Sequence, residues 1–92
     1  MRESTSEEPY FREQVMLAGG YTIKIIPTEA GVTDRLVSFK GRIYLVELKT
    51  AKGELSKIQL FWHKRLTEEF GIRIDTLYGK SEIDNWVATT LV

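Results

Sequence analysis

The sequence predicts a compact α/β domain with the element order helix, strand, strand, strand, helix, strand, helix. Three observations support this class. Some segments repeat apolar residues at helical spacing, and others alternate them with a period of two. The composition, 42% hydrophobic and 28% charged over 92 residues, is typical of a small globular protein. Residues 1–92 are therefore expected to form a single domain.

The first element is expected to be a helix over residues 7–18. Ser6 is a favourable N-cap, and Pro9 falls in the first turn, where a helix needs no backbone N–H. Glu8 lies on the apolar side of this helix, which predicts a carboxylate at the amino end of the inward face. A pair of glycines follows the helix and ends it.

Three strands are expected next. Residues 21–26 form the first, and a loop over residues 27–33, which contains Pro, Gly and Thr, follows it. Residues 34–39 and 42–49 are expected to pair as a hairpin around the turn at residues 40–41.

The second strand of this hairpin is expected to be central in the sheet and covered on both sides, because both of its faces are largely apolar. One face carries Ile43, Leu45, Glu47 and Lys49, and the other carries Tyr44, Val46 and Leu48. Glu47 and Lys49 emerge at the carboxyl end of the strand, where α/β proteins usually bind ligands.

The second half of the chain is expected to form a helix, a strand and a last helix. After a basic loop over residues 50–55, Ser56 is expected to cap a helix over residues 57–70. Residues 72–78 alternate like a strand, and a last short helix is expected to begin at a Ser81 cap.

The middle helix carries an apolar stripe that we expect to form core or dimer contacts. Its members are Phe61, Trp62, Leu66 and Phe70. His63, the only histidine, is expected at the surface or on the flank of this stripe, one turn from Gln59.

The charge pattern limits the possible functions. The formal net charge is zero, which argues against a protein that coats nucleic acid through bulk charge. Residues 35–65 nevertheless carry eight Lys or Arg and two acids, and both flanking segments are acidic. This middle third is either a basic binding surface or an ordinary solvated face.

The sequence also indicates a compartment. It contains no cysteine, which excludes disulfides and thiolate metal sites. No apolar run approaches the ~20 residues of a membrane span, and the first residues do not resemble a secretory signal. We expect a cytoplasmic protein (in the host cell cytoplasm if the protein is viral) that does not bind membranes.

Asp34, Glu47 and Lys49 are the residues with the clearest chemical potential. Two carboxylates and the backbone carbonyl of Leu48 can bind a hard divalent cation, which prefers oxygen ligands. Lys49 can orient a water molecule or offset the charge of a phosphate. The alternative is an ordinary ion pair between Glu47 and Lys49, with Asp34 capping a turn.

Two further residues are candidates for the same site. Glu8 can reach the metal through water, or it can serve only the helix dipole, as Glu7 would equally well. Gln59 lies in the first turn of the middle helix, and its amide can bond a catalytic carboxylate or a phosphate; otherwise it is a solvated side chain.

Four segments together resemble the VRR-NUC (virus-type replication-repair nuclease) family, a branch of the PD-(D/E)-x-K nuclease superfamily. They are GVTDRLV, YLVELKT, GELSKIQ and FGIRIDTLYGKSEI, and the resemblance runs from about Glu8 to Trp86. It implies a restriction-endonuclease-like core with a central mixed sheet. The ordered combination of motifs carries this resemblance, since each motif alone is common.

The resemblance implies a role for each matching residue. The metal aspartate of the family corresponds to Asp34, its E-x-K motif to Glu47 and Lys49, and its helix glutamine to Gln59. Its first-helix glutamate is matched to Glu8, with Glu7 and Glu13 as alternatives. The chain departs from the family pattern at Thr33, where proline is common, and at Pro9, which is unusual directly after the glutamate.

The implied function is an Mg²⁺- or Mn²⁺-dependent DNA endonuclease that acts on branched or structured DNA, such as four-way junctions or flaps. The resemblance suggests a homodimer, and a recruiting helicase or recombination protein is a further class of partner to consider. Four basic residues are expected to contact the DNA backbone without reading sequence: Lys40, Arg42, Lys52 and Lys57. The alternative is a non-catalytic nucleic-acid-binding or assembly module that keeps the nuclease frame.

Overall fold

The computed structural model describes residues 6–25 and 33–92. Its elements follow the expected order: α1 (Glu7–Leu17), β1 (Tyr21–Lys24), β2 (Arg35–Phe39), β3 (Arg42–Lys49), α2 (Lys57–Phe70), β4 (Ile74–Tyr78) and α3 (Gly79–Thr90). The expected loop over residues 27–33 lies outside the described residues except for Thr33, as does the expected end of the first strand at residue 26.

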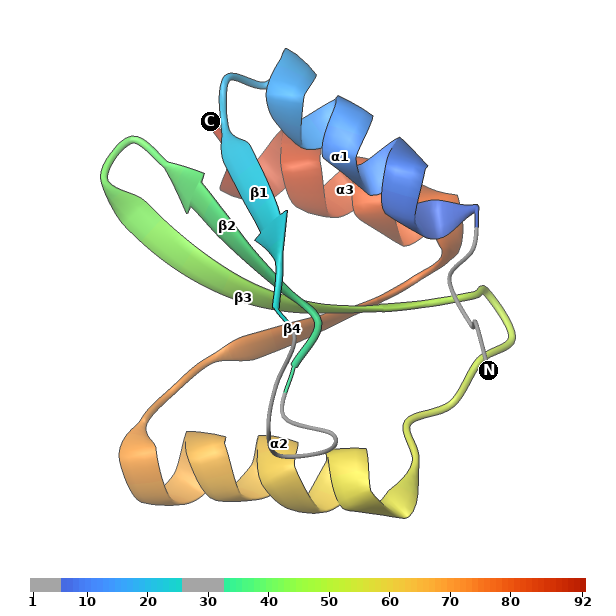
Figure 1. Ribbon diagram of the computed structural model, residues 1–92, viewed down its shortest axis with the longest axis vertical. Coiled ribbons are helices and arrows are strands. Elements are labelled where there is room, and N and C mark those ends of the chain that lie inside the picture. Colours follow the sequence, from blue (N-terminus) through green and yellow to red (C-terminus); the bar gives the residue numbers. More distant parts are fainter. Residues whose placement is uncertain (1–5, 26–32) are drawn as a thin grey trace.

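The four strands form one mixed sheet in the order β1-β2-β3-β4 (Figure 1). The β1–β2 and β2–β3 pairs are antiparallel, and β3–β4 is parallel because the chain crosses over through α2 between them. The central position expected for β3 is confirmed. Its carboxyl end, with Glu47 and Lys49, lies between β4 and the start of β2.

The main core lies on one face of the sheet, under α1 and α3 (Figure 1). Strand alternation places Val37 of β2 and Val46 of β3 on this face, opposite Phe11 of α1 and Ile83 of α3, and all four are fully buried. Trp86 closes the cluster with ring contacts to Phe11 and to Tyr44.

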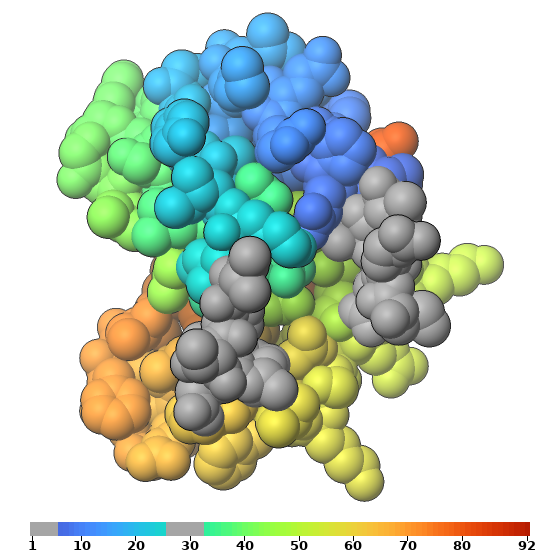
Figure 2. Space-filling view, in the orientation of Figure 1, coloured from blue at the N-terminus to red at the C-terminus, as the bar shows by residue number. Residues whose placement is uncertain are grey.

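Helix α2 lies on the other side of the sheet, but none of its residues is buried. In the space-filling view, α2 forms a lobe of its own below the sheet (Figure 2). Ile43, near the hairpin turn, keeps 65% of its surface exposed. The expectation that β3 is covered on both sides is therefore wrong at its amino end, which lies beyond the reach of α2.

The capping of two helices differs from expectation, and one of them also starts earlier. Helix α3 begins at Gly79 and not after a Ser81 cap, because Glu82 Oε1 accepts a hydrogen bond of 2.9 Å from the Tyr78 N–H and so takes over the capping role. Ser6 occupies the N-cap of α1 as expected, but its hydroxyl donates to Glu7 Oε1 and caps no backbone N–H.

Over residues 6–25 and 33–92, no helix combines the length and apolarity needed to span a membrane.

Gly79→Ala is expected to destabilise the domain more than Gly41→Ala does. Both glycines have φ near +80°, a conformation that costs an alanine about 1–2 kcal/mol. A Cβ at Gly79 would also lie 3.0 Å from the Ala51 Cβ, whereas one at Gly41 meets nothing within 4 Å. Urea unfolding of both variants should show a further loss of about 1 kcal/mol for Gly79→Ala. Equal losses of unfolding free energy in the two variants would mean that Ala51 moves aside without destabilising the domain.

Candidate active site

Asp34 and Glu47 lie opposite each other on the face of the sheet that is turned toward α2. The β2–β3 register pairs Arg35 with Val46, so the next position back along β2 lies across from Glu47. Lys49 shares this face, two residues after Glu47, whereas Leu48 between them points into the main core. The hairpin register therefore brings the three predicted residues together.

Gln59 fixes the orientation of Glu47. Its amide Nε2 donates to Glu47 Oε2 over 3.0 Å. Its Oε1 accepts from the Ser56 backbone N–H over 2.9 Å, and its own N–H donates to Ser56 Oγ, which completes a capping box. One side chain thus begins helix α2 and holds a carboxylate of the site, and the first of the two roles predicted for Gln59, a bond to a carboxylate, is seen directly.

Asp34 Oδ2 accepts a hydrogen bond of 3.4 Å from the backbone N–H of Leu48. The N–H and carbonyl of a strand residue point to the same neighbouring strand, so the Leu48 carbonyl is also directed toward Asp34. Thr33 supports this arrangement from the preceding position, because its Oγ1 donates to the Val46 carbonyl over 3.2 Å. The departure from proline at this position therefore introduces a hydrogen bond that ties the loop end to β3.

The electrostatics of the pair are unfavourable without a cation. Burial raises the pKa of Asp34 above its ordinary value, and the negative charge of Glu47 raises it further. The Leu48 N–H and the charge of Lys24 act in the opposite direction. Such a pair of carboxylates is suited to a divalent cation, whose charge would favour the ionised form of both.

The raised pKa of Asp34 predicts a pH dependence of stability. Because the folded state binds this proton more tightly, the contribution of Asp34 to the free energy of unfolding falls as the pH rises from 3.8 through the raised pKa. Asp34→Asn keeps an acceptor for the Leu48 N–H and removes the charge. We expect the variant to be more stable than wild type at pH 7 in EDTA, with the difference vanishing toward pH 3. Parallel melting curves across this range would contradict the prediction.

Lys49 is 1% exposed, so its side chain lies inside the protein at the level of Glu47. A buried ammonium group interacts with neighbouring negative charge more strongly than one in water does. Within the described residues, no three His, Asp or Glu side chains converge as a metal site. Asp34 and Glu47 would supply two carboxylates, a set typical of Mg²⁺, which keeps several waters and takes further oxygens from substrate phosphate.

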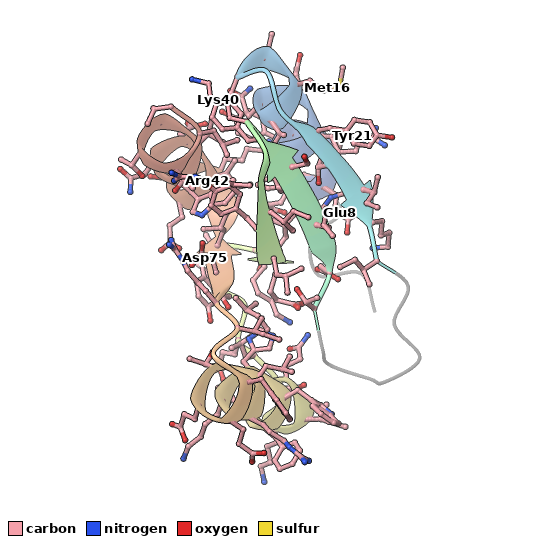
Figure 3. The ribbon with its side chains drawn as sticks, turned by 90° about the vertical axis from the view of Figure 1, so that its left-hand side faces the viewer. Glu8, Met16, Tyr21, Lys40, Arg42 and Asp75 are labelled. Carbon is pink, nitrogen blue, oxygen red and sulfur yellow. The ribbon has the colours of Figure 1, made fainter. Side chains whose placement is uncertain are left out.

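Glu8 lies near these residues but is held by other partners. Its carboxylate contacts Lys24 Nζ at 2.9 Å and Arg35 Nη1 at 3.7 Å, beside β1 and β2 (Figure 3). Its negative charge also raises the pKa of Asp34. The buried carboxylate of α1 is Glu7 and not Glu8, while Glu13 is exposed. The expectation that Glu8 takes the inward position is thus wrong, because Glu7 is the buried carboxylate and Glu8 stays partly exposed beside Lys24 and Arg35.

His63 lies in the site, contrary to the expectation of a surface or flank position. Its side chain is 12% exposed, and its Nε2 lies 3.7 Å from Glu47 Oε1. The spacing of four residues from Gln59 was the available signal, since it places both side chains on one face of the helix. Sequence reasoning recognised this spacing without inferring that the face turns toward Glu47.

The predicted DNA-contacting residues fall into two groups. Lys52 and Lys57 are exposed, on the connection after β3 and at the start of α2, and so flank the site. Lys40 and Arg42 belong to the hairpin at the end of the sheet away from α2 (Figure 3). Arg42 precedes Glu47 by five strand positions, or roughly 17 Å, so the structure does not bring this pair to the site.

Comparison with known proteins identifies the fold. No protein-family model and no curated protein matches the sequence. Among solved structures, the chain is similar to one described as "VRR_NUC domain", with a TM-score of 0.76 and 23% sequence identity, over 90% of this chain and 91% of that one. The VRR-NUC fold and the mixed α/β core that the motifs predicted are therefore confirmed.

Proposed function

We propose that this chain is a metal-dependent nuclease that hydrolyses phosphodiester bonds in DNA. The observation that carries the proposal is the facing pair Asp34 and Glu47, with Lys49 on the same face and Gln59 bonded to Glu47 at 3.0 Å. Fold likeness alone would leave the chemistry open, because one fold serves many functions. Here the charged residues that the motifs predicted also lie together.

The residues fit an Mg²⁺ or Mn²⁺ ion, which the carboxylates of Asp34 and Glu47 and the carbonyl of Leu48 would hold. Such an ion, when bound, lowers the pKa of a water molecule and offsets negative charge on the phosphate. The Gln59 amide holds one oxygen of the Glu47 carboxylate, which helps to place this ligand before the ion arrives.

Lys49 acts on the reacting phosphate. Hydrolysis joins the oxygen of water to phosphorus and breaks one P–O ester bond, and negative charge builds on the phosphoryl oxygens in between. The ammonium group of Lys49 is buried on the face that carries both carboxylates, where it orients the water or stabilises this charge. Lys52 and Lys57, exposed beside the site, hold the DNA backbone.

A symmetric homodimer extends the proposal to branched DNA, because two copies present two sites to two strands. Helix α2 supports a dimer: Ile58 and Phe61, one turn apart on the same face, are 49% and 55% exposed. Such a pair of large apolar side chains on one helix is unusual on a monomer surface.

Replacing Ile58 and Phe61 together with serine is expected to convert a dimer into a monomer, because both side chains would leave the same face of α2. Sedimentation velocity of wild type and variant measures the change. Met16→Ser removes an equally exposed apolar side chain from α1 and serves as the control, expected to leave the dimer intact. A wild-type protein that stays monomeric at concentrations of tens of micromolar would refute the dimer.

The proposed activity is tested with end-labelled single-stranded, duplex, flap and four-way-junction DNA of shared sequence, each in Mg²⁺, Mn²⁺ and EDTA. Cleavage in metal alone supports the nuclease, and fastest cleavage of the flap or junction supports the preference for branched DNA. Salt-sensitive binding without cleavage in either metal would instead favour a binding module that keeps the nuclease frame.

A further inference from the structure

The Glu47 carboxylate has two oxygens, and α2 presents one nitrogen to each. Gln59 Nε2 donates to Oε2 at 3.0 Å, and His63 Nε2 lies 3.7 Å from Oε1. Both side chains come from one face of the helix, a single turn apart. The capping box at Ser56 fixes the first turn of α2 and so sets the positions of both.

His63 Nε2 is buried and has no hydrogen-bond partner among residues 6–25 and 33–92. A buried polar nitrogen without a partner is unfavourable, and such groups in folded proteins usually have a task. Glu47 Oε1 is an acceptor 3.7 Å away, a few tenths of an ångström beyond hydrogen-bond distance. A small shift of the carboxylate or the ring closes this contact.

We propose that His63 is a positioning residue for Glu47, with Nε2–H donating to Oε1 while Gln59 donates to Oε2. This inference rests on the proposed function, because it gives Glu47 the role of metal ligand. With a donor at each oxygen, the carboxylate cannot rotate about its Cγ–Cδ bond. Each oxygen keeps a lone pair with which it could bind a cation held by Glu47 and Asp34.

The alternative role for His63 is direct ligation of the metal, which predicts a different order of affinities among divalent metals. Imidazole favours transition metals such as Mn²⁺ and Co²⁺ over Mg²⁺, whereas a bond to a carboxylate ligand strengthens the binding of every divalent ion. In the described part of the chain, His63 does not join the carboxylates as a three-ligand group, which favours the positioning role.

The test measures the binding of Mg²⁺, Mn²⁺ and Co²⁺ by calorimetry, without DNA, to wild type, His63→Leu and His63→Gln. Loss of the donor in His63→Leu is expected to weaken all three metals by about tenfold. His63→Gln keeps a donor at similar reach and should restore binding to within about threefold of wild type. Lys64→Ala, an exposed neighbour on α2, is the matched control and should bind as wild type does.

Each outcome decides between the possibilities. Unchanged metal binding in His63→Leu overturns the proposal, and so does a loss confined to Mn²⁺ and Co²⁺, which would assign His63 as a ligand. Weak binding in both His63→Leu and His63→Gln, with melting temperatures lowered in EDTA, would assign a packing role and also overturn it. If His63→Leu does not fold, the comparison of His63→Gln with His63→Met takes its place. Failure of wild type to bind any of the metals would contradict the proposed function itself.

Discussion

Replacing Lys49 with methionine is expected to slow metal-dependent DNA cleavage by roughly 10²- to 10³-fold, the usual loss when one charge-stabilising group is removed. Methionine fills similar space without the charge, and Lys49 is 1% exposed, so a substitution of similar size preserves packing best. The proposed metal ligands, Asp34 and Glu47, remain. Single-turnover cleavage of a labelled substrate at saturating metal measures the effect on the chemical step.

The control for this variant is Lys52→Ala, which removes an exposed positive charge just after the same strand. It should weaken DNA binding, most strongly at low salt, and leave the saturated rate within a few fold of wild type. If Lys49→Met cleaved at the wild-type rate while bound to metal, the role given to Lys49 would be refuted. If it no longer bound metal, Lys49 would support the ligands and not the reacting phosphate.

Phe11→Ala is expected to have the largest effect on stability, a loss of about 3–5 kcal/mol in the free energy of unfolding. Phe11 is fully buried at the centre of the core, where its ring contacts that of Trp86 with centroids 5.7 Å apart. The substitution removes apolar contact and leaves a cavity that the helix pair α1 and α3 cannot close. Small domains are stable by only about 5–15 kcal/mol, so the variant should be partly unfolded at 37 °C.

Met16→Ala is the matched control on the same helix, because Met16 is 67% exposed. Its loss should stay within about 0.5 kcal/mol, the usual range for surface positions. Urea unfolding followed by circular dichroism measures both variants. Equal effects of the two substitutions would contradict the assignment of the core to the face of the sheet under α1 and α3.

The order of elements and the heart of the site could be predicted from the sequence because both depend on local spacing. Alternation along residues 42–49 identified β3 and put Glu47 and Lys49 on one face. The short hairpin then determined the partner of Glu47, since two strands joined by a tight turn have little freedom of register. Asp34 therefore had to lie close to Glu47.

Features that depend on how elements pack were harder to predict. His63 faces Glu47 only because α2 crosses the sheet at the carboxyl end of β3, and helical spacing alone does not reveal this direction. The start of α3 was misplaced because a side chain four residues later, Glu82, caps the Tyr78 N–H. Lys40 and Arg42 were predicted to contact DNA because of their charge alone. That prediction ignored the length of β3, which separates them from the site.

The proposed metal-dependent nuclease activity is tested most directly by comparing wild type with Asp34→Asn. Both are assayed for cleavage of a four-way junction and its matched duplex, in Mn²⁺ and in EDTA. We expect metal-dependent cleavage by wild type, none in EDTA, and a loss of at least about 10²-fold in Asp34→Asn, whose fold remains intact. Wild-type cleavage in EDTA, or equal cleavage by the variant, would contradict the claim that Asp34 and Glu47 bind a metal that cuts DNA.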